Sequence, residues 1–315
     1  MIDAYLEHLR VERGCSPHTL SAYARELDAL RQACPPPPHV PTEHEVRRHV
    51  AQSTRDGMAP RSIARRLSAW RGYCDFLVQR HAADANPVRN VRAPKLPRRL
   101  PKALPPDEAT RLVAFDVQAA IDARSTRTHA RFEALRDKAI LELLYSSGLR
   151  LSELVSLDVR HVDTPGHRSA SWLSLPEREA FVTGKGRKMR TVPIGQPACE
   201  ALAAWIEARA EHMAALPGGD PHALFVGVRG ARISPRVVQS LVARRGAAQG
   251  VASRVHPHVL RHSFASHLLQ SSGDLRAVQE LLGHANIATT QIYTSLDFQR
   301  LAAVYDAAHP RARRK

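Results

Sequence analysis

A small set of residues in the second half of the chain has the side-chain types that phosphoryl transfer needs. Tyr293 carries a hydroxyl group that can attack phosphorus, and Lys185 can donate a proton to the leaving oxygen. Arg150 and Arg261 can neutralise the charge that develops on the non-bridging oxygens in the transition state. A metal ion usually supplies that neutralisation, but the sequence shows no obvious carboxylate cluster for one. We therefore expect cationic side chains to replace the metal.

Arg150 lies in the segment Ser-Gly-Leu-Arg-Leu-Ser-Glu-Leu, residues 147–154. Gly148 is expected to end one helix and Ser152 to cap the next, which places Arg150 in a turn at the start of a helix. Backbone N–H groups at a helix start favour anions, and an arginine adds bidentate phosphate binding. An arginine in a turn is more often solvated or paired with a carboxylate such as Glu153, so this segment alone leaves both interpretations open.

The segment 256–262 reads His-Pro-His-Val-Leu-Arg-His and places His258 and Arg261 three residues apart. On a helix this spacing puts both side chains on one face. Apolar residues occupy roughly the opposite side and account for the buried face; they are Leu260, Phe264 and Leu268. His258 and Arg261 would then face something polar together. A surface histidine beside a surface arginine is the alternative if nothing else accompanies the pair.

The remaining candidates lie in a predicted hairpin and near the end of the chain. Apolar residues of segment 170–194 surround a Gly-Lys-Gly turn, which predicts two or three strands with Lys185 at a hairpin tip. His284 ends a predicted helix, and Tyr293 follows nine residues later. Each has an ordinary alternative, because a tyrosine in an amphipathic helix is usually a core residue and a histidine often lies at a helix C-terminus.

Apolar periodicity and capping residues predict how the chain positions these groups. Its 315 residues suggest two domains. Residues 1–85 predict four short amphipathic helices, residues 86–106 an extended, basic, proline-rich linker, and residues 107–315 a mostly helical domain with one small sheet. The fold class expected is mainly α with a small β-sheet (α+β). Helices are expected near 107–122, 131–147, 196–213, 234–249, 257–271, 274–282, 286–294 and 297–308, and a loose insertion at 116–130.

The composition indicates a polyanionic partner and excludes several classes of protein. Lys and Arg total 46 against 30 Asp and Glu, giving a net charge of +16. A soluble enzyme from an organism with arginine-rich usage is the alternative. The 4 cysteines show no CxxC spacing and the 17 histidines no HExxH, so neither structural zinc nor a disulfide framework is expected. No apolar run is long enough for a membrane span and charges begin at Asp3, so we expect a cytoplasmic protein.

Five motifs in order resemble the tyrosine recombinase (phage integrase) family over nearly the whole chain: GLRLSEL, TGKGRK, HxLRHSFASHLL, LLGHA and TTQIYT. The resemblance implies an N-terminal helical core-binding domain and a C-terminal catalytic domain. It implies that Tyr293 forms a 3′-phosphotyrosine while Lys185 protonates the released 5′ oxygen. The residues implied to bind the phosphate are Arg150, His258, Arg261 and His284. The reaction would pass through a Holliday junction and need no ATP, metal or other cofactor.

The segments 16–20 and 304–312 further resemble the branch of this family that resolves bacterial chromosome dimers at cell division. This implies double-stranded DNA with a specific recombination site as substrate and a sister recombinase in a heterotetramer. A septal DNA translocase is a further candidate partner, and no membrane is involved. The chain from about Asp297 onward would pass to a neighbouring subunit. Segments 116–130 and 164–178 are longer than is typical of the family.

Three other functions are alternatives. A phage or transposon integrase would use the same chemistry for insertion, but such proteins often carry an extra N-terminal arm-binding domain. A type IB topoisomerase would use it to relax supercoils, but usually lacks this compact N-terminal domain. A non-catalytic DNA-binding regulator would explain the charge, the helices and the linker, but not Tyr293 and Lys185 within the full set.

Overall fold

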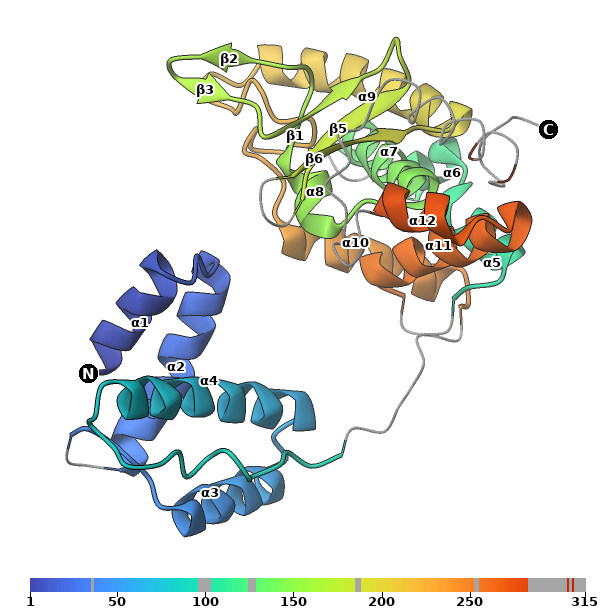
Figure 1. Cartoon of the computed structure of the whole chain (residues 1–315). Coiled ribbons are helices and arrows are strands. Elements are labelled where there is room, and N and C mark those ends of the chain that lie inside the picture. Colours follow the sequence, from blue (N-terminus) through green and yellow to red (C-terminus); the bar gives the residue numbers. More distant parts are fainter. Residues whose placement is uncertain are drawn as a thin grey trace. The chain divides into compact units, whose positions relative to one another are not determined.

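A computed structural model of the chain divides into two compact units, Met1–Leu100 and Pro101–Lys315 (Figure 1). The predicted class, mainly helical with one small sheet, is confirmed. The division falls within the predicted linker, whose limits at 86 and 106 stay a prediction. The structure describes residues 1–34, 37–95, 103–123, 129–184, 188–251, 255–282, 305 and 308. No helix in these ranges is long and apolar enough to cross a membrane.

The first unit contains the four helices expected from its apolar periodicity. They are α1 (Ile2–Val11), α2 (Pro17–Ala33), α3 (Glu43–Arg55) and α4 (Pro60–Gln79). Ser16 caps α2 by accepting a hydrogen bond from the backbone N–H of Thr19, and Thr42 and Glu45 form a capping box at the start of α3. The apolar faces of these helices meet in one core around Trp70, which is 1% exposed.

Both described ends of the predicted linker pack against the units that they join, a feature that the expectation of an extended basic chain does not include. Val88 and Val91 are buried in the core of the first unit. At the other end, the backbone N–H of Leu104 donates to Ser263 Oγ at 2.9 Å, and His267 Nε2 donates to the carbonyl of Leu104 at 2.8 Å. The apolar residues among the prolines and arginines explain this packing, because their burial removes apolar surface from water.

The second unit is built around α7, which is buried along most of its length and contacts α9 and α11 (Figure 1). Its helices are α5 (Pro106–Val113), α6 (Val117–Asp122), α7 (Ala130–Ser147), α8 (Leu151–Ser156), α9 (Gln196–Ala214), α10 (Pro235–Ala248), α11 (Pro257–Ser272) and α12 (Leu275–Leu282).

Two predictions from the sequence were wrong: a single helix near 107–122, and a loose insertion at 116–130. The helix is divided, because Asp116 accepts hydrogen bonds from the backbone N–H groups of Gln118 and Ala119 and so begins α6 as a new helix. The insertion therefore contains α6 and the start of α7. The helices predicted at 286–294 and 297–308 lie outside the described residues, apart from Tyr305 and Ala308.

The sheet has the strand order β1-β4-β5-β6, with β1 (Leu157–Asp158) parallel to β4 (Ser171–Ser174). The strands β5 (Glu179–Thr183) and β6 (Met189–Pro193) pair antiparallel, with Thr183 opposite Met189. The predicted strands around Lys185 are thus present, although Lys185 itself lies outside the described residues. A separate hairpin of β2 (Asp163–Thr164) and β3 (His167–Arg168) fills part of the segment predicted to be long.

Candidate active site

The turn between α7 and α8 fixes Arg150 beside Glu153. Gly148 ends α7 in the left-handed conformation, as expected, with φ +59°. Arg150, and not the predicted Ser152, is the N-cap of α8. Glu153 Oε2 accepts from the backbone N–H of Arg150 at 2.8 Å, and its Oε1 accepts from Arg150 Nη1 at 2.8 Å. A glutamate at the third helical position reaches back to the cap, so one carboxylate holds both the backbone and the side chain of Arg150.

Glu153 is the centre of a cluster of three arginines. Its carboxylate is 2% exposed and accepts two hydrogen bonds from Arg190, from Nη1 at 2.8 Å and from Nη2 at 2.9 Å. Arg261 Nη1 lies 4.0 Å from Oε2 of the same carboxylate. Burial alone would raise the pKa of Glu153, but Arg190 and Arg150 outweigh it and lower the pKa. One anionic carboxylate therefore faces three guanidinium groups, and the cluster carries excess positive charge.

Helix α11 presents His258 and Arg261 as predicted. The apolar residues on its other side, Leu260, Phe264 and Leu268, are buried. His258 is exposed, whereas the side chain of Arg261 is 11% exposed. Burial, together with the nearby positive charges of Arg150 and Arg190, lowers the pKa of Arg261 to about 10. Arg261 therefore remains protonated at neutral pH in a place where a further anion would be favourable.

Arg261 also connects the ends of two other helices to α11. Its Nη1 donates to the carbonyl of Gly148, at the end of α7, and its Nη2 donates to the carbonyl of Leu282 at 2.6 Å, at the end of α12. Carbonyls in the last turn of a helix have no partner within the helix, so they are suitable acceptors for such a side chain. Arg261 thus holds α12 close to Arg150, and α12 leads into the chain that carries His284 and Tyr293.

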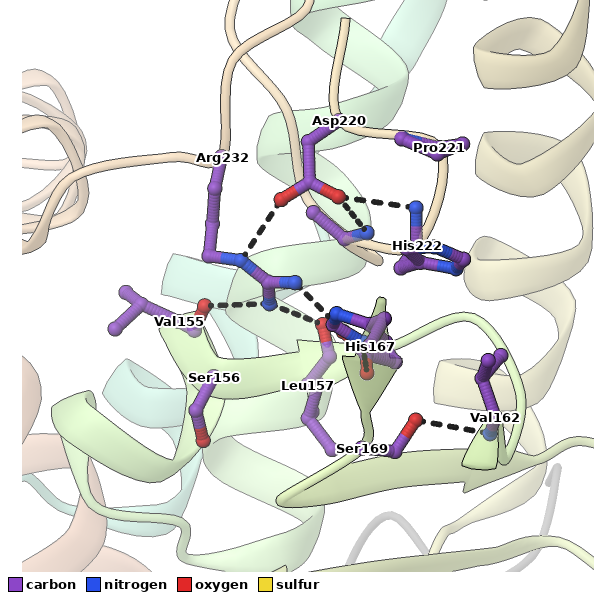
Figure 2. Close-up of polar contacts among 12 residues, drawn as sticks. Val155, Ser156, Leu157, Val162, His167, Ser169, Asp220, Pro221, His222 and Arg232 are labelled. Carbon is purple, nitrogen blue, oxygen red and sulfur yellow. Dashed lines mark hydrogen bonds and ion pairs between the residues drawn. The ribbon is translucent and has the colours of Figure 1, made fainter. Parts of the chain in front are cut away.

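Arg232 holds the C-terminal end of α8 (Figure 2). Arg232 Nη1 donates to the carbonyls of Val155 at 3.3 Å and Leu157 at 3.0 Å, at the end of that helix. Its Nη2 lies 2.6 Å from Asp158 Oδ1 and its Nε 3.1 Å from Asp220 Oδ2. The short helix that begins at Arg150 is therefore held at both ends by buried or partly buried ion pairs, which fixes where Arg150 lies.

The hairpin β2–β3 is attached to this same network through His167. His167 Nε2 lies 2.7 Å from Asp158 Oδ2, and the His167 ring stacks on His222 with centroids 4.0 Å apart. Asp158 is 1% exposed, and although burial raises its pKa, the hydrogen bonds from Arg232 and His167 lower it overall. The segment 164–178, predicted to be long, is therefore an ordered hairpin and strand that brace the end of α8.

The structure brings together the two predicted arginines, Arg150 and Arg261, and places His258 one helical turn before Arg261. Lys185, His284 and Tyr293 lie outside the described residues. In the described part of the chain, no group of three or more His, Cys, Asp or Glu side chains could hold a metal ion.

Gly148 tests how tightly this site is packed, because a Cβ atom there would overlap the ring of Phe264. We expect Gly148→Ala to lower the free energy of unfolding by about 2–4 kcal/mol, from left-handed strain plus overpacking. Gly273→Ala is the matched control, because Gly273 also ends a helix with positive φ, but a Cβ atom added there would have no neighbouring atom within 4 Å. It should lose only about 1 kcal/mol. Urea unfolding of the full chain measures both, and equal losses would contradict the overlap with Phe264.

Comparison with known proteins identifies the family of this site. Residues 110–300 match the phage integrase family, and residues 2–81 match the phage integrase N-terminal SAM-like domain. The chain is 54% identical over 324 residues to the tyrosine recombinase XerC of Ralstonia pickettii, covering 100% of this chain and 94% of that protein. It is 46% identical to XerC of Salmonella typhi, covering 99% and 96%. The chain belongs to the phage integrase family of tyrosine recombinases. It is therefore a DNA strand-exchanging enzyme, as the motifs predicted.

The fold of the recombinase is also similar to solved structures of this family. The XerH site-specific recombinase bound to palindromic difH substrate, in a post-cleavage complex, matches with a TM-score of 0.63 at 20% identity. The match covers 97% of this chain and 84% of that one. This likeness in fold and the two family matches confirm the expected architecture of an N-terminal helical domain and a C-terminal catalytic domain.

Two residues of the recombinase's arginine cluster, Arg190 and Glu153, were not predicted as part of the site. Arg190 was not a candidate, although it occupies a strand position whose neighbour on the same face, Val192, is buried. A charged residue at such a position signals a specific buried partner. Glu153 was considered only as a counter-ion that would argue against a role for Arg150, whereas it holds Arg150 and Arg190 and lies close to Arg261.

Proposed function

We propose that this recombinase cuts and rejoins DNA at a specific site through a 3′-phosphotyrosine at Tyr293 and a Holliday junction. The observation that carries the proposal is the arginine cluster around Glu153, in which Arg150 is 32% exposed and Arg261 is held close to it. The excess positive charge of this cluster fits one phosphate group. Arg150 and Arg261 would bind its non-bridging oxygens and stabilise the charge that grows on them in the transition state.

Each step of the proposed reaction exchanges one phosphorus–oxygen bond for another. Tyr293 Oη bonds to phosphorus as the bond to the 5′ oxygen breaks, and Lys185 gives that oxygen a proton. His258 and His284 hydrogen-bond the phosphate and assist movement of the tyrosine proton. In the second step the 5′ hydroxyl of the exchanged strand attacks phosphorus and releases Tyr293. The energy of the broken bond is kept in the phosphotyrosine, so no ATP is needed.

The described hairpin supports the role proposed for Lys185. Strands β5 and β6 pair antiparallel from Glu179 opposite Pro193 to Thr183 opposite Met189, and Lys185 lies between the two strands in the sequence. Arg190 of β6 contacts Glu153 directly, which brings this hairpin to the arginine cluster. Because Lys185 lies between these strands in the sequence, we infer that it acts beside the residues that would hold the phosphate.

Replacing Lys185 with alanine tests general-acid catalysis. On ordinary DNA we expect cleavage to fall by about 10²–10⁴-fold, because the 5′ oxygen leaves without a proton. In a substrate with sulfur at the bridging 5′ position, the sulfur leaves readily without a proton. Lys185→Ala should therefore cleave this substrate at close to the wild-type rate. Single-turnover cleavage of nicked suicide substrates measures both rates. An equal loss on the two substrates would show that Lys185 positions the DNA instead.

We further propose that the recombinase resolves chromosome dimers at cell division with an XerD-like partner in a heterotetramer. Identity of 54% to an XerC protein across the whole chain supports this role over phage or transposon integration. A septal DNA translocase would then act on the assembly, and the chain from about Asp297 would contact the neighbouring subunit. In this structure Tyr305 is 1% exposed and packs on Phe264 of its own chain, so the exchange would have to replace that contact.

A chromosome-terminus resolution site with two half-sites tests the partnership. We expect the recombinase to load cooperatively with an XerD-type recombinase, raising the affinity for the second half-site at least about tenfold, which corresponds to about 1.4 kcal/mol. Gel-shift titration with each protein alone and with both measures this, and Holliday junctions should form only in the mixture. Junctions formed by this chain alone on the site would contradict the heterotetramer.

A further inference from the structure

Arg190 connects three parts of the site that have different proposed roles. It lies on β6, the strand that follows Lys185, and is 8% exposed. Two of its nitrogens donate to Glu153, at 2.8 and 2.9 Å, and its Nε donates to the carbonyl of Leu281 at 3.0 Å. Glu153 in turn holds Arg150, and Leu281 lies in the last turn of α12. One guanidinium therefore contacts the hairpin, the arginine cluster and the helix that leads toward His284.

The contacts at the end of α12 are shared between two arginines. Arg190 donates to the carbonyl of Leu281, and Arg261 donates to the carbonyl of the next residue, Leu282. Both arginines also lie beside Glu153. The end of α12 is thus held by two guanidinium groups that both lie beside one carboxylate. A displacement of Arg190 would therefore affect both the carboxylate that holds Arg150 and the end of α12.

The arrangement is specific to an arginine at this position. Burying a charge in a strand is unfavourable unless the charge is paired and hydrogen-bonded, and Arg190 is both. Its planar fork reaches the two oxygens of Glu153 while Nε points to the carbonyl of Leu281, which a lysine with a single ammonium group cannot reproduce. Each of the three guanidinium nitrogens donates to a protein group, and the side chain is buried, so we infer that Arg190 acts through other residues.

We propose that Arg190 is a positioning residue that sets Lys185 and the end of α12 in place relative to Arg150 and Arg261. The proposal rests on the function proposed above and adds to it a residue through which the general acid is aligned with the phosphate-binding arginines. Without Arg190, the hairpin would lose its ion pair with Glu153 and α12 would lose the hydrogen bond to the carbonyl of Leu281, while Arg150 and Arg261 would remain present.

Cleavage of two suicide substrates by Arg190→Gln and Arg190→Lys in the full chain tests this. We expect both variants to bind DNA within about threefold of wild type, because Arg190 is buried and its described hydrogen bonds go to protein groups. On the oxygen substrate cleavage should fall by at least about 30-fold, within the range for a lost general acid. On the bridging-sulfur substrate the loss in cleavage rate should be at least about tenfold smaller, because a sulfur leaving group does not need the proton that a misplaced Lys185 fails to supply.

Arg168→Gln is the matched control, since Arg168 is an exposed strand arginine paired with an aspartate, Asp163, away from Glu153. It should cleave both substrates at the wild-type rate. Equal losses for the Arg190 variants on both substrates would show a purely structural role and overturn the proposal, as would wild-type rates. If Arg190→Gln does not fold, Arg190→Lys is judged by the same comparison.

The outcomes also separate this proposal from the function on which it rests. Wild-type protein must form a covalent complex, and Lys185→Ala must be rescued by sulfur. If either fails, the proposed chemistry is wrong. If both hold and the Arg190 variants show no recovery that is specific to sulfur, only the positioning role is wrong.

Discussion

Replacing Tyr293 with phenylalanine is expected to abolish covalent attachment to DNA and leave specific DNA binding unchanged. Phenylalanine keeps the ring but lacks the hydroxyl oxygen that would bond to phosphorus. We expect other side chains to make the phosphate and base contacts, so the affinity should stay within about twofold of wild type, a change of about 0.4 kcal/mol. Denaturing gels after incubation with a nicked suicide substrate measure the adduct, and gel shifts measure binding.

Tyr305→Phe is the matched control for this loss. Tyr305 follows 12 residues later, is 1% exposed and packs near Phe264, with tilted rings whose centroids are 6.4 Å apart. Phenylalanine preserves that packing, so the control should form the adduct at close to the wild-type rate. A persistent adduct in Tyr293→Phe would falsify the assignment of the nucleophile, and loss of the adduct only in Tyr305→Phe would point to the second tyrosine.

Replacing Arg261 with alanine is expected to slow cleavage by about 10²–10³-fold or more, the effect of removing one preorganised donor from a developing anion. Two consequences add here, because the substitution removes a positive charge from the cluster and releases the carbonyls of Gly148 and Leu282. DNA affinity should fall much less, since one phosphate contact among many contributes little to total binding. Single-turnover cleavage with saturating protein separates the two effects.

Arg276→Ala provides the comparison for net charge. Arg276 lies on α12, is 60% exposed and pairs with Glu280. Its removal lowers the charge of the protein equally but should leave the cleavage rate within about twofold, because exposed ion pairs contribute little. A loss in Arg261→Ala no larger than that in Arg276→Ala would contradict the role of Arg261 at the phosphate.

Local sequence signals predicted the parts of this site that depend on neighbours along the chain. Gly148 ends α7, and the spacing of His258 and Arg261 with apolar residues opposite them describes α11 correctly. The hairpin strands on either side of Lys185 follow from the apolar residues that surround the Gly-Lys-Gly segment. Each of these depends on helix or strand periodicity, which is visible within a few residues.

Contacts between distant residues could not be predicted in this way. Arg190 and Glu153 are 37 positions apart, and Arg190 and Leu281 are 91 positions apart. No periodicity links such pairs, and only the packing of α8, β6 and α12 brings them together. The prediction of the N-cap of α8 was wrong for a similar reason. Serine is a common N-cap residue, so Ser152 was predicted, but Glu153 stabilises Arg150 in that position through a contact that cap propensity does not describe.

The most direct test of the account is to identify the atom of the recombinase that becomes attached to DNA. Covalent complex trapped on a suicide substrate would be digested with protease and nuclease, and the modified peptide would be sequenced by mass spectrometry. We predict a nucleotide joined through its 3′ phosphate to the hydroxyl of Tyr293, with a free 5′ hydroxyl on the released strand. A nucleotide on any other residue, or linkage through a 5′ phosphate, would contradict the account.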